Sequence, residues 1–281
     1  MLVVGGIIGA GIFLSPSVVA QRVGTSGLTL TAWGLGALVA LAGAFVYAEL
    51  GALRPKAGGT YIYLRDAFGP LPAFLYGWAL FLIMATGAIA AVAMTGASYT
   101  ATLFGAGDEA IRPIAISFIV VLTFLNVLGV SIGATTGNIL TVLKLAAIAI
   151  LVFAALLLAP SHPMPVQDIA PLTVPDRPAA LVMAMGAALV PVLFSFGGWQ
   201  QTNAVAEELR NPERTLPRAL IIGVLIVVAT YMLVNLSYLR ALGVGGLAAS
   251  RAPAADTMFV FLWAIGLLVG GRLARYVLAA E

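Results

Sequence analysis

The sequence contains no cysteine and very little charge. Its 281 residues include one histidine, and 9% of them are charged, whereas 62% are hydrophobic. A soluble globular domain carries charge on about a quarter of its residues, so the composition excludes that class. The absence of cysteine excludes disulfides, thiol catalysis and cysteine metal sites. Because His162 stands alone in a proline-rich stretch, the sequence predicts neither a metal site nor a cofactor.

Positive charge is scarce as well, and only the placement of the cations along the chain is informative, because it predicts the orientation in the membrane. The net charge of +3 is spread along the chain, so the sequence predicts no nucleic-acid surface. The densest cations, including Arg54, Lys56 and Arg65, fall in loops that are inside if the N-terminus is cytoplasmic. We therefore expect a plasma membrane protein with a cytoplasmic N-terminus. Most of these cations should be topology signals or contacts to lipid headgroups.

Long apolar runs dominate the chain. A bilayer core of about 30 Å requires roughly 20 apolar residues for each helix. The runs that meet this length lie near residues 2–22, 29–52, 73–104, 112–131, 136–159, 181–205, 216–240 and 257–279. All should be helices, because lipid offers backbone polar groups no other partner. The segments that we expect to be loops include residues 54–72, 132–137, 160–178 and 241–256. The sequence thus predicts an all-α multi-pass membrane protein.

Two of the eight runs are poor continuous helices. The first contains Gly5, Gly6, Gly9 and Gly11, and the sixth reads "VPVLFSFGGWQQTN". Interrupted spans in paired positions indicate a transporter binding site, since irregular backbone at membrane depth must line protein or a cavity. Close helix packing through small residues is the alternative, and for the glycines of the first span taken alone it stays open.

Interrupted helices offer groups that suit a zwitterion. The second half of the first span presents free N–H groups, and the first half of the sixth presents free carbonyls, which carry the opposite partial charge. We expect the carboxylate of such a zwitterion to bind the N–H groups of Ala10, Gly11 and Ile12, with Gly9 allowing close approach. We expect its ammonium group to bind carbonyls near Ile7, Ile8, Phe194 and Ser195. The aromatic residues Phe194, Phe196 and Trp199 either shape the side-chain space or pack within the bundle.

Four ordered motifs carry a family resemblance. They are "VVGGIIGAGIFLSP", "YAELGALRPKAGGTYIYLRDAFGP", "FSFGGWQ" and "EELRNPERTLPRAL". Their order and spacing resemble the amino acid–polyamine–organocation superfamily, and within it the bacterial amino acid permeases related to L-type amino acid transporters. The resemblance implies one transmembrane domain with a five-plus-five inverted repeat, of which residues 1–159 form the first repeat. Residues 181–281 then form an incomplete second repeat, helices 6 to 8, so we expect a fold truncated to about eight helices.

The resemblance also assigns roles to particular residues. Residues 9–12 match the family's carboxylate-binding segment, and residues 194–198, which include Gly197 and Gly198, match its ammonium and side-chain segment. Phe194 falls where a gating aromatic residue is expected. Gln200 replaces an acidic residue that some relatives link to their response to pH.

Lys144 is the one ionisable residue well inside a predicted span. A buried charge in lipid is unfavourable by several kcal/mol, so this lysine should face the bundle and have a partner. The resemblance places it where proton-coupled relatives carry a lysine and sodium-coupled relatives bind an ion. We expect it to bind carbonyls near Gly6 and Ile7 and to couple transport to protons. Snorkelling toward the membrane surface is the competing interpretation.

These observations predict a secondary active transporter that moves amino acids across the membrane by alternating access, through proton-coupled symport or exchange. Its partners would be the amino acid, protons and membrane lipid. The alternative is a truncated or regulatory relative that binds an amino acid without transporting it. An enzyme or channel is disfavoured, because the sequence offers no intramembrane catalytic dyad, metal cluster or charged ring.

Overall fold

The computed structural model describes residues 2–158, 177–209 and 211–262, and within them every regular element is a helix. Six of the described helices are long and apolar enough to cross a membrane: Ser26–Leu53, Pro70–Phe104, Asp108–Val127, Thr135–Leu157, Pro178–Glu207 and Pro212–Ala249. The prediction of an all-α multi-pass membrane protein is therefore confirmed. The remaining two predicted spans are the first, which is broken, and the eighth, of which only the beginning lies within the described residues.

The first predicted span is two helices. The first, α1 (Leu2–Ile7), and the second, α2 (Gly11–Val23), are separated by residues 8–10. Helix α2 ends at Gly24, whose φ of 70° lies in the left-handed region. Thr25 then caps α3 (Ser26–Leu53), because its side chain accepts a 3.2 Å hydrogen bond from the N–H of Leu28.

The sixth predicted span is interrupted too. Helix α9 (Pro178–Phe196) gives way after two glycines to the 3-10 helix η3 (Trp199–Glu208). Gly198 has a φ of 110°, which only glycine adopts readily. The next helix, α10 (Pro212–Ala249), bends at Gly243, where φ is 67°. Discontinuity is thus confirmed in both spans.

The third span is one long helix of three parts. Helix α5 (Pro70–Ala79) runs into a π-helical turn, η1 (Leu80–Ala85), and continues as α6 (Thr86–Phe104). A short 3-10 turn, η2 (Asp108–Ala110), leads to α7 (Ile111–Val127), and α8 (Val130–Leu158) follows.

Three predicted loops are wrong, one of them completely and two in part. Residues 54–72 contain α4 (Thr60–Phe68), and residues 132–137 lie inside α8, because the chain turns earlier at Gly129 with a φ of 143°. Residues 241–256 are helical up to Ala249, and a short apolar helix, Pro253–Leu262, begins before their end. Glycines suggested loops here, but glycine is common within membrane helices. Most of the predicted loop 160–178, and residues 263–279 of the eighth span, lie outside the described residues.

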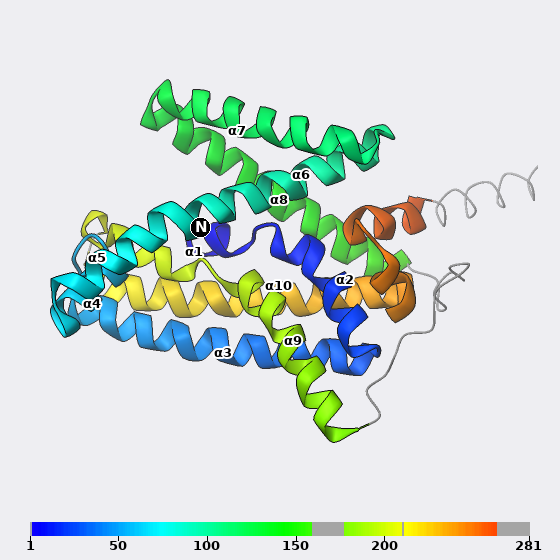
Figure 1. Ribbon diagram of the computed structural model, residues 1–281, viewed down its shortest axis with the longest axis horizontal. Helices are drawn as coiled ribbons and strands as arrows, with labels where there is room; N and C mark the ends of the chain where they lie inside the picture. Colours follow the sequence, from blue (N-terminus) through cyan, green and yellow to red (C-terminus); the bar gives the residue numbers. More distant parts are fainter. Residues whose placement is uncertain (1, 159–176, 210, 263–281) are drawn as a thin grey trace, which may run out of the picture.

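The helices form a buried bundle and an outer layer. Figure 1 shows the long helices α3 and α10 side by side, with α2 and α9 against them, and contacts join these four elements. At their centre Trp33, Phe196 and Tyr231 are fully or almost fully buried, with neighbouring ring centroids 5.1 to 5.8 Å apart. Helices α6, α7 and α8 lie on one side of this bundle (Figure 1). They expose mostly apolar side chains, as lipid contact requires.

Candidate functional site

A lysine side chain binds the backbone carbonyls at the first interruption. Lys144 on α8 donates hydrogen bonds from Nζ to the carbonyl oxygens of Gly5, at 2.7 Å, and Ile8, at 2.5 Å. These carbonyls lie at the end of α1, where a helix leaves its last carbonyls without internal partners. Lys144 forms no ion pair with any described residue. The predicted contact to backbone carbonyls is thus present, at Gly5 and Ile8 rather than Gly6 and Ile7.

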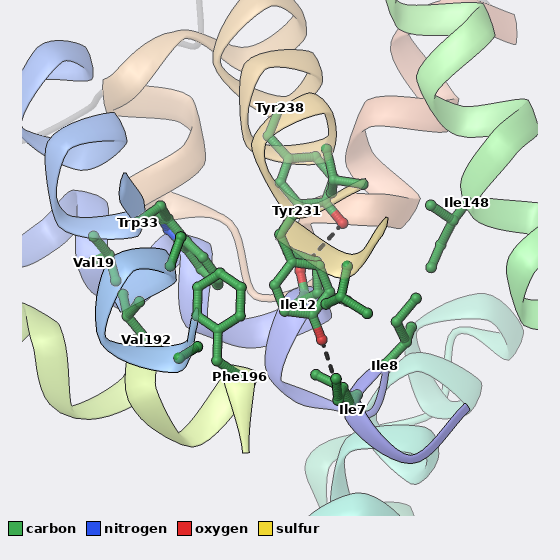
Figure 2. Packing of buried hydrophobic residues seen from close by; sticks show 14 of the residues in the cluster. Ile7, Ile8, Ile12, Val19, Trp33, Ile148, Val192, Phe196, Tyr231 and Tyr238 are labelled. Carbon is green, nitrogen blue, oxygen red and sulfur yellow. Dashed lines mark hydrogen bonds between the residues drawn. The ribbon is translucent and has the colours of Figure 1, made fainter. Parts of the chain in front are cut away.

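A tyrosine that sequence reasoning missed connects the two interruptions. The Tyr231 hydroxyl on α10 lies 3.1 Å from the carbonyl oxygen of Ile7 and 3.1 Å from that of Ser195. Figure 2 shows the hydroxyl pointing at Ile7 from within the packed core. Because it has a single proton, the hydroxyl shares that proton between the two carbonyls. One side chain therefore binds the end of α1 and the end of α9 together.

The two broken helices also meet backbone to backbone. A Cβ atom on Gly198 would lie 2.5 Å from the carbonyl oxygen of Gly6, and one on Gly11 would lie 2.4 Å from Ser195 Oγ. The Ser195 hydroxyl is 2.9 Å from Ser15 Oγ and 2.7 Å from the carbonyl oxygen of Pro191. Gly11 and Gly198 are thus required by packing, whatever else they do. In contrast, a Cβ on Gly9 would meet only the Ile7 carbonyl oxygen, at 3.9 Å.

A cavity of about 660 Å³ lies beside the first interruption. Its lining comes from the interruption itself, from α2, α6, α8 and α10, and from the short helix Pro253–Leu262. Five residues of the predicted site line it: Ile8, Gly9, Ala10, Ile12 and Lys144. Most of the other lining residues are apolar, including Ile148, Leu151 and Val234. The volume suits a small organic ligand, and the walls suit an apolar side chain.

The start of α2 supplies free donors at this cavity. The N–H groups of Ala10, Gly11 and Ile12 find no acceptor among the described residues, whereas the N–H of Phe13 bonds to the carbonyl of Ala10. Free N–H groups at a helix N-terminus attract anions. The predicted carboxylate-binding residues therefore lie together, with Ala10 and Ile12 on the cavity wall and Gly11 buried behind them.

The predicted ammonium acceptors are arranged differently. Each of the four carbonyls already accepts a hydrogen bond: Ile7 and Ser195 from Tyr231, Ile8 from Lys144, and Phe194 from the N–H of Gly197. A carbonyl oxygen retains a second lone pair, so these bonds do not prevent another donor from approaching. Of the four residues, only Ile8 lines the cavity.

The structure does not bring the aromatic residues of the sixth span to the cavity. Phe194 is 57% exposed, and Phe196 packs against Trp33 with centroids 5.8 Å apart. Trp199 stands edge-on to Tyr47, 5.0 Å between centroids. Neither these three residues nor Gly197 and Gly198 are among the cavity-lining residues.

Two further tyrosines reach the start of α2. The Tyr99 hydroxyl on α6 donates to the carbonyl of Phe13 at 2.8 Å, and the Tyr238 hydroxyl on α10 lies 3.5 Å from that of Ile12. Both tyrosines line the cavity. The only advance signal for them was a hydroxyl group inside an apolar run, which needs a partner when buried.

Comparisons with known proteins agree with this architecture. The profile of the family described as "Amino acid permease" matches residues 1–278. The chain is 35% identical over 258 residues to the b(0,+)-type amino acid transporter 1 of Oryctolagus cuniculus. The aligned region covers 90% of this chain and 52% of that protein. It is 33% identical over 272 residues to the serine/threonine exchanger SteT of Bacillus subtilis, covering 97% and 59% respectively.

A third relative has a different named substrate. The chain is 34% identical over 295 residues to the cystine/glutamate transporter of Homo sapiens, covering 97% of this chain and 57% of that protein. The chain thus spans a little more than half the length of the curated relatives it matches. Since the family profile extends over almost the whole sequence, the chain belongs to the amino acid permease family of the amino acid–polyamine–organocation superfamily.

Proposed function

We propose that this chain is the substrate-binding part of a secondary active transporter that moves amino acids across the plasma membrane by alternating access. The observation that carries the proposal is the set of free N–H groups at the start of α2, where Ala10 and Ile12 line a largely apolar cavity. The transporter and exchanger names of its relatives support it. The inverted repeat of residues 1–159 and 181–281 is part of the same proposal.

In this proposal the substrate binds through its main-chain groups. Its carboxylate receives the N–H groups of Ala10, Gly11 and Ile12, and its ammonium group approaches the second lone pair of the Ile8 carbonyl. Its side chain occupies the cavity between α6, α8 and α10. Residues 194–199 then act on the site through the contact of Gly198 with Gly6 and through Tyr231, rather than by lining the cavity.

Lys144 is the proposed coupling residue. Its ammonium group binds the carbonyls of Gly5 and Ile8, so its charge stabilises the interrupted conformation of the first helix. A neutral lysine donates weaker hydrogen bonds, because charge-assisted bonds are roughly twice as strong as neutral ones. Loss of a proton would therefore favour a different arrangement of α1, which links protonation to the transport cycle.

Uptake by the chain in liposomes tests this function. We expect accumulation of a radiolabelled neutral amino acid that increases with an inward proton gradient. Lys144→Ala should lose the response to the gradient and keep part of the amino acid binding. Lys56→Ala, in the loop before α4, is the matched control and should behave as the parent. If Lys144→Ala responds to the gradient as the parent does, Lys144 is not the coupling residue.

Two related mechanisms give different results in the same liposomes. Exchange would require amino acid inside the vesicles and would show little response to the proton gradient. A regulatory relative would bind amino acid in detergent without any uptake. Uptake and binding are therefore measured on the same preparation.

The proposed orientation has its own test, because the chain has no cysteine of its own. A cysteine at Ala106, an exposed residue between α6 and η2, should react with a membrane-impermeant maleimide added outside cells. A cysteine at the exposed Glu213, at the start of α10, should react only after the membrane is opened. The reverse pattern would place the N-terminus outside the cytoplasm.

A further inference from the structure

A buried asparagine joins three elements at the end of the molecule away from α2. Asn203 on η3 is fully buried, and its Nδ2 donates to the carbonyl of Tyr47 on α3 and to the hydroxyl of Tyr63 on α4, both at 2.9 Å. Its Oδ1 has no partner within the described part of the chain. The side chain is therefore held in place by its two N–H donors.

The backbone beside Asn203 contacts the loop that leads into α4. The N–H of Gly58 donates to the carbonyl of Ala204 at 3.1 Å. A Cβ on Gly59 would lie 3.0 Å from the Ala204 nitrogen and 3.2 Å from the carbonyl carbon of Asn203. Gly58 and Gly59 have φ values of 106° and 48°. The glycine pair of the "KAGGTYIY" motif thus lets this loop lie directly against η3.

Helix α3 also packs against the Asn203 side chain. A Cβ on Gly51 would lie 2.9 Å from Asn203 Nδ2, so the amide packs against bare backbone. The Tyr47 hydroxyl is 3.2 Å from Thr60 Oγ1 at the start of α4. Burial raises the pKa of the Tyr63 hydroxyl, which therefore stays neutral and keeps its proton near neutral pH.

These contacts connect the second interruption to the cavity wall. Asn203 follows the turn at Gly198 within the short helix η3. Helix α4 leads through Gly69 directly into α5, which continues through η1 into α6. Val92, Thr95 and Tyr99 of α6 line the cavity. A displacement of η3 would therefore pull on α4, and α4 on the helix that forms one wall of the cavity.

We propose that Asn203 is a positioning residue that locks η3 to α4 and to the part of α3 around Tyr47, so that these three segments move as one body. The lock itself does not depend on the proposed function. Its effect on transport does rest on that function: movement of η3 reaches α6 only while the lock holds. The "YAELGALRPKAGGTYIYLRDAFGP" motif contains both the tyrosines that accept hydrogen bonds from Asn203 and the glycines that pack against η3.

Hydrogen–deuterium exchange of the whole chain in lipid nanodiscs tests the lock. Loss of one net hydrogen bond changes an opening equilibrium by up to about tenfold. Asn203→Ala removes both bonds, so we expect amide exchange across residues 58–68 to rise by roughly ten- to a hundredfold. Tyr63→Phe removes one bond and should raise it several-fold. Tyr61→Phe is the matched control, because this hydroxyl on the same helix has no partner among the described residues and should change nothing.

Two results would overturn the proposal. One is unchanged exchange of residues 58–68 in both Asn203→Ala and Tyr63→Phe. The other is a rise in α7 equal to that in α4, which would indicate general unfolding. If Asn203→Ala fails to fold, the comparison of amide exchange in Tyr63→Phe and Tyr61→Phe tests the lock.

Uptake assays test the effect of the lock on transport. Tyr63→Phe should slow uptake several-fold, with amino acid binding retained. A parent chain without uptake would reject the proposed transport and leave the exchange result to decide on the lock.

Discussion

The two interrupted helices are broken by similar sequences, yet their breaks have different geometry. In the first, the chain passes from α1 to α2 without any residue at positive φ, and Gly9 lines the cavity. In the second, Gly198 turns the chain at a φ of 110° and lies against the backbone of Gly6. The first break opens backbone groups to a cavity, whereas the second brings two backbones together. Two glycine-rich breaks can therefore differ in what they do, because the neighbouring residues decide whether a break lines a cavity or packs against another backbone.

Gly198→Ala should give the largest effect on this comparison. The new methyl group would lie 2.5 Å from the carbonyl oxygen of Gly6 and would force alanine to a φ of 110°. Strain and overpacking together predict a loss of roughly 2–5 kcal/mol in the free energy of unfolding. The melting temperature in detergent measures it. Gly186→Ala on α9 is the control: nothing lies within 4 Å of its Cβ position, so stability should be kept or slightly raised. Equal melting temperatures for the two variants would refute the close contact.

Substitutions of Gly11 and Gly9 test two different roles at the first break: Gly11 in packing and Gly9 in substrate binding. Gly11→Ala would place a methyl group 2.4 Å from Ser195 Oγ, so we expect a loss of about 1–3 kcal/mol in unfolding free energy. Gly9→Ala meets no close atom and should leave the melting temperature nearly unchanged. It adds a methyl group to the cavity wall beside the free N–H groups, and it favours helix over the break by about 1 kcal/mol. Amino acid binding should therefore fall about tenfold. Binding at the parent's affinity would place the substrate elsewhere.

Tyr231→Phe should give a smaller loss of stability than Gly198→Ala, and it should act at both breaks through one lost hydroxyl group. Loss of the hydroxyl removes a hydrogen bond shared by the carbonyls of Ile7 and Ser195, which predicts a loss of about 1–2 kcal/mol. Amide exchange should rise for Ile8 and for Gly197 together. Tyr76→Phe is the control, since that hydroxyl bonds to no described residue. A rise at one break alone would show that Tyr231 does not connect them.

Local rules located the breaks and the lysine, because they depend on residues that are neighbours in sequence. Clustered glycines lower helix stability, so both breaks could be predicted approximately, although Gly5, Gly6 and Pro191 themselves lie within helices. A charged side chain deep in an apolar span must find a partner, and Lys144 does so at Gly5 and Ile8. The free N–H groups of α2 follow from the break itself.

The tyrosine contacts could not be predicted in the same way. Tyr231 and its acceptor Ile7 are 224 residues apart, and Tyr99 and its acceptor Phe13 are 86 apart. In a membrane span the lipid-facing and bundle-facing sides are both apolar, so hydropathy does not say which way a side chain points. Helix α4 was missed for another reason: its glycine-rich start and its charges resemble a loop, and its burial depends on η3.

The π-helical turn in the third span marks a place where the chain should tolerate a change of length. A π turn holds one residue more than a regular α-helix needs along the same path, and such turns occur often at functional sites. The six residues of η1 are all unburied, so the extra residue disturbs no packing within the described chain. On one side of the turn α5 contacts α4, and on the other side α6 lines the cavity. A one-residue deletion within 80–85 would return this stretch to a regular α-helix without removing a buried side chain, so it should be tolerated where most deletions in a span are not.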